Sequence, residues 1–123
     1  MYKRQIVDID LHYGDGTANI FSSIPEVIYH HVAGGSRENF LTDLAAFLDS
    51  INECDIIAVS AGFDRHEQDW GGTLKTIDYQ NAAKLIKEFS EKTCEGRRYA
   101  VLEGGYNHNV LGKNVRAFLE GFK

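Results

Sequence analysis

The sequence has 123 residues, which is enough for one domain with its own hydrophobic core. A hydrophobic content of 43% and a charged content of 25% are typical of a globular chain and exclude a disordered one. The net charge is −5, no basic run exceeds Arg97-Arg98 and no apolar run approaches membrane-spanning length, so we expect neither a nucleic-acid surface nor a membrane span.

Four short apolar runs predict strands, and they cover residues 4–12, 26–32, 55–63 and 98–105. The first, third and fourth runs are nearly continuous, which is typical of strands covered on both faces. Apolar residues recur at helical spacing over 37–52, 77–93 and 109–121, with Ser36, Thr76 and either Asn107 or Asn109 as expected N-caps. This alternation predicts an α/β fold: a single domain over 1–123 with a mostly parallel sheet of about four strands flanked by helices.

The cysteines and the N-terminus indicate the compartment. Cys54 and Cys94 lie far apart without the spacing of a metal or redox motif, and the first ten residues lead into a strand without a signal peptide. We therefore expect a cytoplasmic protein whose two thiols are reduced.

Polar residues gather where three predicted strands end. Asp8, Asp10 and His12 alternate along the first strand, so they share one face, and Asp64 follows the third strand. Ligands of parallel α/β sheets bind at the carboxyl ends of the strands, which predicts that Asp10, His12 and Asp64 converge, with Tyr106 nearby. Two carboxylates and an imidazole suit a catalytic zinc site, and a tyrosine hydroxyl beside it suits an oxyanion.

Each of these residues also has a structural interpretation. An isolated D-x-D pair is more often a solvated strand end, and a "GGY" is usually a turn. His30 and His31 are neighbours on a strand and so face opposite sides, which favours separate roles. The remaining polar residues near the strand ends are expected in loops: His66, Asp69, Trp70 and His108.

Three segments together resemble the histone deacetylase, acetoin-utilisation and acetylpolyamine amidohydrolase superfamily. "DIDLHYGDGT" is similar to the family's D-x-D-x-H-H-G-D/N-G-T segment, and "LEGGYN" matches its L-E-G-G-Y-N turn. "SAGFDRHEQDWGGTLKTIDY" is similar to its S-A-G-F-D-x-H segment and the L-T-x-x-x-Y stretch that follows. The resemblance implies an arginase–deacetylase-like fold and hydrolysis of an acetyl amide on lysine, a polyamine or a related small molecule.

The resemblance also implies roles for individual residues. Asp10, His12 and Asp64 would bind Zn²⁺, although this donor set suits other divalent ions too. Tyr106 would polarise the amide carbonyl and hold the oxyanion, on a loop shaped by Gly104 and Gly105.

Two further acids have supporting roles in the family. Asp8 would belong to a structural K⁺ or Na⁺ site. Asp15 would be a carboxylate behind the zinc ligands. In the family, both acids also orient a tandem histidine pair that supplies the general base.

The sequence departs from the family in ways that bear on catalysis. Family domains are well over twice this length, and their histidine pair lies upstream of the first motif. Only nine residues precede Asp10, so we expect the pair to be absent and amide hydrolysis to be slow. Tyr13 also stands where many relatives have a histidine.

The sequence therefore leaves more than one functional hypothesis open. The chain is a zinc-dependent deacetylase-like hydrolase with impaired catalysis, or a metal-binding, catalytically silent remnant with a structural or partner-binding role. A third hypothesis is a fragment that a separately encoded N-terminal half completes. Residues 98–103 would lie at an edge of the sheet in the absence of that half, which predicts a homodimer or higher oligomer.

Overall fold

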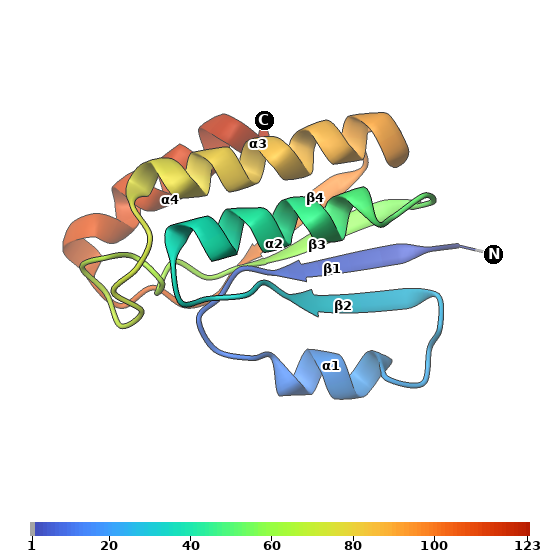
Figure 1. Cartoon of the computed structure of the whole chain (residues 1–123), viewed down its shortest axis with the longest axis horizontal. Helices are drawn as coiled ribbons and strands as arrows, with labels where there is room; N and C mark the ends of the chain where they lie inside the picture. The colour runs from blue at the N-terminus through green and yellow to red at the C-terminus, as the bar shows by residue number, and fades with distance from the viewer. Residues whose placement is uncertain (1) are drawn as a thin grey trace.

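The computed structural model describes residues 2–123, which form a parallel sheet with helices against it (Figure 1). The elements in chain order are β1 (Arg4–Asp8), α1 (Asp15–Phe21), β2 (Val27–His31), α2 (Arg37–Asp49), β3 (Ile56–Ala61), α3 (Thr76–Thr93), β4 (Arg98–Leu102) and α4 (His108–Phe122). The strand order is β2-β1-β3-β4, and every pair is parallel. The predicted α/β architecture is confirmed.

The hydrophobic core lies between the sheet and three of the helices. In Figure 1, α2, α3 and α4 lie together along the sheet, whereas α1 lies beyond β2, apart from them. Val7 of β1 and Val59 of β3 belong to one buried cluster with Phe40, Leu44 and Ile86 of the helices. Burial of these side chains holds the sheet against the helices. The carboxyl ends of β1, β3 and β4 lead into loops at one edge of the sheet, where ligands of such sheets bind.

The helix caps follow the sequence closely, with one correction. The Ser36 and Asn107 side chains accept hydrogen bonds from backbone N–H groups in the first turns of α2 and α4, as predicted. Thr76 is not the cap of α3 but its first residue. The cap is Lys75, whose backbone N–H donates to the Asp78 carboxylate (2.7 Å), so an acid in the first turn performs the capping task.

The structure contains a helix that the sequence patterns did not predict. α1 has seven residues, none of them buried, so its sequence carries no apolar period from which a helix could be predicted. No helix among the described residues is long and apolar enough to cross a membrane.

Two strand predictions need correction. β1 ends at Asp8, so Asp10 and His12 lie in the turn after the strand and not on a shared strand face. β4 lies at an edge of the sheet, as predicted, but its residues from Tyr99 to Leu102 are exposed. The expectation that this strand is covered on both faces is therefore wrong for the described part of the chain.

Candidate metal centre

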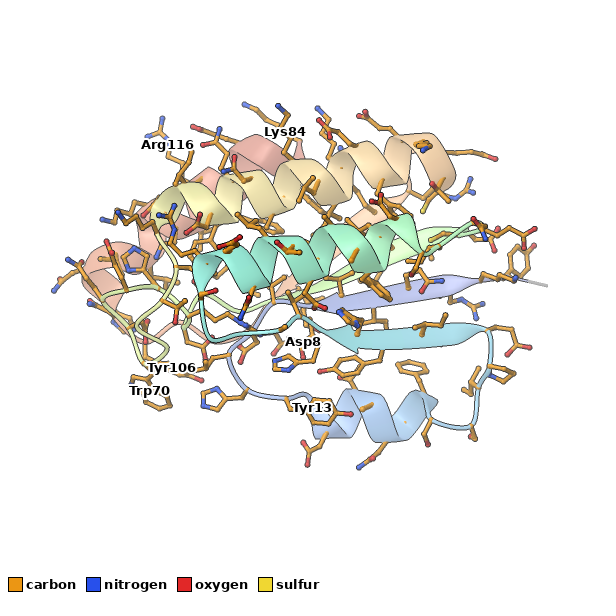
Figure 2. The ribbon with its side chains drawn as sticks, viewed as in Figure 1. Asp8, Tyr13, Trp70, Lys84, Tyr106 and Arg116 are labelled. Carbon is orange, nitrogen blue, oxygen red and sulfur yellow. The ribbon has the colours of Figure 1, made fainter. Side chains whose placement is uncertain are left out.

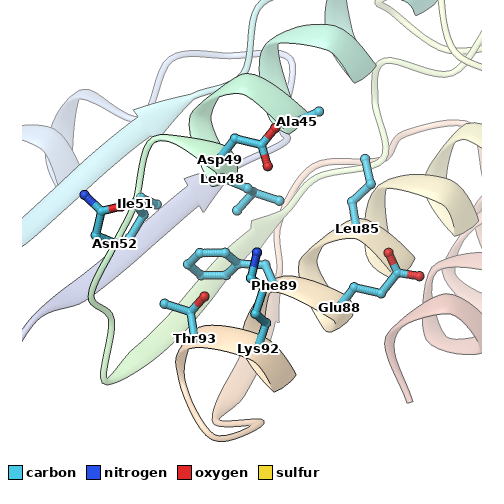
Figure 3. Close-up of a pocket in the computed structure, with 10 residues that line it drawn as sticks. All are labelled: Ala45, Leu48, Asp49, Ile51, Asn52, Leu85, Glu88, Phe89, Lys92 and Thr93. Atoms are coloured by element: carbon cyan, nitrogen blue, oxygen red, sulfur yellow. The ribbon is translucent and has the colours of Figure 1, made fainter.

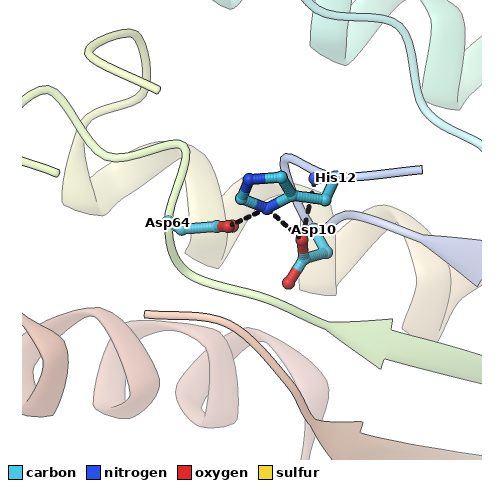
Figure 4. Close-up of side chains that lie close together, drawn as sticks. All are labelled: Asp10, His12 and Asp64. Atoms are coloured by element: carbon cyan, nitrogen blue, oxygen red, sulfur yellow. Dashed lines mark hydrogen bonds and ion pairs between the residues drawn. The ribbon is translucent and has the colours of Figure 1, made fainter. Parts of the chain in front are cut away.

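Asp10, His12 and Asp64 converge at the carboxyl ends of β1 and β3 (Figure 4). Each offers a ligand atom, and these atoms lie within 4.8 Å of one another. His12 Nδ1 lies 3.0 Å from an Asp64 oxygen and 3.4 Å from an Asp10 oxygen. Asp64 is fully buried and His12 is half exposed, so the group of donors is closed to solvent at Asp64 and open to it at His12.

Backbone N–H groups hold both carboxylates. Asp64 accepts from Leu11 N–H (2.9 Å), while Asp10 accepts from the N–H groups of His12 (2.8 Å) and Gly104 (2.8 Å). Such bonds orient carboxylates before a ligand arrives. These hydrogen bonds hold the turn after β1 in a shape that brings Asp10 and His12 to Asp64, so no extended strand is needed.

Two glycines let the neighbouring backbone approach these acids. A Cβ on Gly62 would lie 2.0 Å from an Asp10 oxygen, and one on Gly104 would lie 2.5 Å from Asp10 and 2.8 Å from Asp64 oxygens. Gly105 has a positive φ of 140°, a conformation that favours glycine. Gly104 and Gly105 thus shape this loop, and Gly62 is a third close contact that the sequence analysis did not single out.

Burial and neighbouring charges act on the carboxylates of the site. Burial raises the pKa of the Asp64 carboxyl, and the Asp10 charge adds to this, while Leu11 N–H and His12 oppose it. A divalent cation would relieve the repulsion between the two carboxylates. Two carboxylates and one imidazole with an exposed side are the donor set of a catalytic zinc site, so the residues fit such an ion.

Tyr106 lies on the same cavity as two of the three candidate ligands, Asp10 and His12, a space of about 440 Å³ that Gly104 also lines. Its ring stacks on Trp70 with centroids 4.2 Å apart and an interplanar angle of 21°. The two side chains lie together at one end of the molecule (Figure 2). Partial burial and the charges of Asp64, Asp10 and Asp69 raise the pKa of the Tyr106 hydroxyl.

Asp69 fixes the loop that carries Tyr106. Its carboxylate accepts from the backbone N–H groups of Tyr106 (2.8 Å) and Asn107 (2.9 Å), and also from that of Trp70 (2.7 Å). Asp69 and Trp70 lie in a loop, as predicted, but their contacts with Tyr106 were not predicted. Only their position inside the second of the three family-like segments pointed to such a role.

Asp8 and Asp15, the two supporting acids, have different surroundings. Asp8 is buried and accepts hydrogen bonds from the Tyr29 hydroxyl and from Asp10 N–H (3.0 Å). It therefore connects β2 to the turn that carries Asp10. Asp15 is exposed at the start of α1, where its carboxylate accepts from Gly16 N–H (3.0 Å) and not from the candidate ligands.

The other histidines of the described chain make their contacts away from the ligand atoms. His30 binds Asp43 through Nε2 (2.7 Å), whereas His31 Nε2 lies 2.8 Å from the Asp10 carbonyl oxygen, so the two have separate roles as predicted. His66 is buried beside α3, with its Nδ1 accepting from Gln68 N–H (3.1 Å). His108 begins α4 and lies near Trp70 on a separate hollow.

The expected K⁺ or Na⁺ beside Asp8 does not fit the described residues. The backbone carbonyls that follow β1 and β2 already accept hydrogen bonds from the Arg65 guanidinium. Arg65 was not among the predicted site residues, and the sequence held no signal for it beyond its place next to Asp64.

A second cavity lies far from these residues. It is a space of about 550 Å³ between the ends of α2 and α3, lined by Leu48, Phe89 and Lys92 among others (Figure 3). These elements contribute no group of candidate metal ligands among the described residues. The one group of candidate metal ligands found among the described residues therefore lies at the carboxyl ends of the strands.

Two solved structures have the same fold as this chain. The structure of the histone deacetylase Clr3 superposes with a TM-score of 0.82 at 19% identity and covers 99% of this chain and 27% of its own. The HDA15 HD domain gives a TM-score of 0.73 at 22% identity over 98% of this chain and 44% of its own. The sheet and helices described above are therefore those of the arginase–deacetylase fold.

The sequence comparisons establish the family. The family model described as "Histone deacetylase domain" matches residues 32–122, so the chain belongs to this family. The chain is 30% identical to "Histone deacetylase 14, chloroplastic" of Arabidopsis thaliana over 145 residues, covering 89% of this chain and 34% of that protein. It is 31% identical to "Histone deacetylase 10, chloroplastic" of Oryza sativa subsp. japonica, covering 93% of this chain and 34% of that protein.

The extent of these matches defines what is shared. The chain spans about a third of the length of these two curated relatives. The family match begins at residue 32, so Asp10 and His12 lie before it and Asp64 and Tyr106 lie within it. What ties Asp10 and His12 to the matched region is their contact with Asp64 in the folded chain.

Proposed function

We propose that the chain is a zinc-dependent, deacetylase-like amidohydrolase that cleaves an acetyl amide slowly. The observation that carries the proposal is the convergence of Asp10, His12 and Asp64 beside a cavity that Asp10 and His12 share with Tyr106. Family membership supports deacetylation as the reaction class. Acetyl-lysine, acetylated polyamines and related small amides are the substrates to test, because each presents the same acetyl amide.

The roles of the residues follow from their positions. Asp10, His12 and Asp64 would hold the ion, which when bound would polarise the acetyl carbonyl and acidify a bound water. The Tyr106 hydroxyl would donate a hydrogen bond to the oxygen of that carbonyl as negative charge develops on it. Asp69 and Trp70 would keep Tyr106 in place, through its backbone N–H and its ring respectively.

The surroundings of the candidate ligands support the proposal of slow turnover. Apart from His12, the described residues bring no imidazole to the ligand atoms, and a positioned general base typically supplies about 10²–10⁴-fold in rate. Asp8 is engaged by Tyr29, and Asp15 is exposed away from the site. We therefore expect catalysis well below that of a site with a dedicated base.

The test combines zinc stoichiometry with acetate release from an acetyl-lysine peptide and from an acetylated polyamine. We expect weak turnover that is lost in Asp64→Ala, reduced in Tyr106→Phe and unchanged in Asp49→Ala, a control that removes an acid from the distant cavity. Circular dichroism checks that the Asp64→Ala chain is folded. Zinc-loaded protein without turnover would overturn this proposal and leave the silent metal-binding remnant, which the comparisons do not favour.

We also propose that β4 is covered by a second copy of this chain. Tyr99 and Val101 are 51% exposed and Leu102 is 67% exposed, on a strand that ends the sheet. An apolar edge strand with unpaired backbone groups favours pairing with another strand, and a twofold pairing would satisfy both copies. Light scattering at micromolar concentration should show a dimer or larger species, and a monomer alone would contradict this.

We propose a cytoplasmic location as well. Cys54 and Cys94 are both buried as free thiols, which agrees with a reducing compartment. Fractionation of cells expressing the tagged chain tests this, and recovery in a membrane-enclosed or secreted fraction would contradict it.

A further inference from the structure

Arg65 is the most unusual charged residue of the fold. Its side chain is only 3% exposed, and none of the ion pairs among the described residues includes it. A buried charge without compensation would be strongly destabilising. The groups that surround its guanidinium must therefore supply the compensation.

Backbone carbonyl oxygens accept the hydrogen bonds of the Arg65 guanidinium. Burial lowers the Arg65 pKa, and the nearby Asp8, Asp64 and Asp10 charges oppose this lowering. Nε donates to Ile9 O (3.0 Å) and Asp10 O (3.1 Å), Nη2 to Asp10 O (2.9 Å) and Val32 O (2.6 Å), and Nη1 to Ala33 O (3.1 Å). These four oxygens, which we call the carbonyl cluster, come from the residues that follow β1 and β2. The Phe40 ring completes the surroundings, with its centroid 5.2 Å from Arg65 Cζ.

A cluster of carbonyl oxygens is also the arrangement with which proteins replace the hydration shell of K⁺. Converging carbonyl dipoles repel one another unless a cation lies between them. Here a planar guanidinium with five N–H donors fills that place, and it is more weakly hydrated than an ammonium group. Because the cation is part of the chain, its position does not depend on the salt in solution.

The backbone of Arg65 is fixed as tightly as its side chain. Its carbonyl oxygen accepts from the N–H groups of Thr73 (2.9 Å) and Leu74 (2.8 Å), and a Cβ on Gly71 would lie 2.6 Å from its Cα. Arg65 directly follows the candidate ligand Asp64, and its side chain binds the carbonyl of the candidate ligand Asp10. One residue therefore connects the two carboxylates of the site through the backbone on one side and the guanidinium on the other.

We propose that Arg65 is a built-in cation that takes the place of a bound K⁺ or Na⁺ in the carbonyl cluster and positions Asp10 against Asp64. Arg65 is a positioning residue, since it acts on the metal site through the backbone of Asp10. The proposal requires no turnover, so its tests remain decisive if the proposed hydrolase activity is absent.

The first test uses the unaltered chain. Its thermal unfolding midpoint should be the same in KCl, NaCl and tetramethylammonium chloride at equal ionic strength, because the carbonyl cluster already holds a cation. A saturable increase of the midpoint with K⁺ or Na⁺, absent with tetramethylammonium, would overturn the proposal without the need for a variant.

The second test removes the guanidinium. Arg65→Ala should lower the midpoint on the order of 10 °C, since several charge-assisted hydrogen bonds are lost. K⁺ or Na⁺ should then restore part of the midpoint, and tetramethylammonium should not. If the variant is unfolded without K⁺ or Na⁺, the same comparison is made by recovery of folded protein at increasing KCl.

A matched control separates this effect from the loss of any structural arginine. Arg37 donates to the Asp78 carboxylate (2.7 and 3.0 Å) and not to carbonyls, so Arg37→Ala should be destabilised without recovery specific to K⁺ or Na⁺. Arg65→Ala that behaves like Arg37→Ala would overturn the proposal.

The third test measures the positioning role. Zn²⁺ affinity, determined against a competing chelator, should fall about 10–100-fold in Arg65→Ala and recover with KCl, because groups that support metal ligands affect affinity by this amount. Arg65→Lys supplies a charge with fewer donors, so its Zn²⁺ affinity should lie between those of the unaltered chain and Arg65→Ala. An affinity that is unchanged in Arg65→Ala would show that the guanidinium stabilises the fold without positioning the ligands.

Discussion

The carboxyl ends of β1 and β3 and the outer edge of β4 belong to one sheet, but they differ in which side chains are buried. At the carboxyl ends, Asp8, Asp64 and Arg65 are buried. Along β4, Tyr99 and Val101 are half exposed. Charged side chains are therefore buried in the first region, whereas apolar side chains are exposed to solvent in the second.

The two regions differ in how many of their polar groups have hydrogen-bond partners within the chain. Asp8, Asp64 and Arg65 each have several hydrogen-bond partners, so the cost of their burial is offset inside the chain. The outer backbone edge of β4 has no neighbouring strand among the described residues. The charged side chains of the first, polar region therefore have their partners within the chain, whereas the apolar side chains of β4, the apolar region, form an exposed surface of the kind that favours contact with another surface.

The largest effect is expected from a substitution that disturbs the carboxylates at the carboxyl ends of β1 and β3. Gly104→Ala would place a Cβ 2.5 Å from Asp10 and 2.8 Å from Asp64 oxygens, which displaces both carboxylates. We expect at least about 10–100-fold weaker Zn²⁺ binding and a loss of about 1–3 kcal/mol of unfolding free energy. Zinc titration and urea unfolding measure the two quantities.

Gly16→Ala is the matched control for this change. A Cβ on Gly16 meets nothing within 4 Å, and the residue lies in α1, so the variant should bind Zn²⁺ unchanged and be no less stable. Equal metal affinities of the two variants would show that the close approach of Gly104 is not required.

The next largest effect is expected on the apolar region. Val101→Lys puts a charge on the exposed strand and should raise the dimer dissociation constant at least about tenfold, without lowering the thermal unfolding midpoint of the monomer. Ile20→Lys is the control, because Ile20 is also exposed but lies on α1. Light scattering over a concentration series distinguishes them, and the same dissociation constant for both variants would place the interface elsewhere.

A smaller effect is expected where the polar region meets solvent. Trp70→Ala removes the ring stacked on Tyr106, an interaction worth about 0.5–1.5 kcal/mol, so kcat should fall about 2–12-fold. Trp70→Phe keeps an aromatic ring and should retain most of the rate. A change confined to KM would indicate that Trp70 contacts the substrate and does not position Tyr106.

The smallest effect tests an acid that lies close to the carbonyl cluster without being part of the candidate metal site. Burial raises the pKa of Asp43, but Ala33 N–H and His30 outweigh it and hold that pKa below its ordinary value. A depressed pKa contributes stability above the pKa of the unfolded chain and loses it as the pH falls through the folded value. Asp43→Asn should therefore cost less than about 1 kcal/mol at pH 7, and the difference from the unaltered chain should shrink below about pH 4 in urea unfolding. A difference that grows as the pH falls would contradict this assignment.

Much of the fold was predictable from local patterns. The buried positions of α3, among them Ala82, Ala83 and Ile86, follow the helical spacing of its sequence, and the hydrophobic runs located all four strands. The predicted metal ligands also converge as expected, although the turn after Asp8 brings Asp10 and His12 into place and an extended strand does not. α1 escaped prediction because a short exposed helix leaves no apolar period.

The sequence by itself determined the four strands, the order of α2, α3 and α4 among them, the mostly parallel sheet, and the acids and histidine that meet at its carboxyl ends. Only the tertiary structure decided that Arg65 holds the carbonyl cluster, that Asp69 and Trp70 hold Tyr106, and that β4 is exposed. The physical reason is that these outcomes depend on groups distant in sequence: the Arg65 side chain bonds Ile9 across 56 positions, and Asp69 bonds Tyr106 across 37. Local periodicity records which residues are buried, whereas hydrogen bonds between distant segments determine what a buried charge contacts.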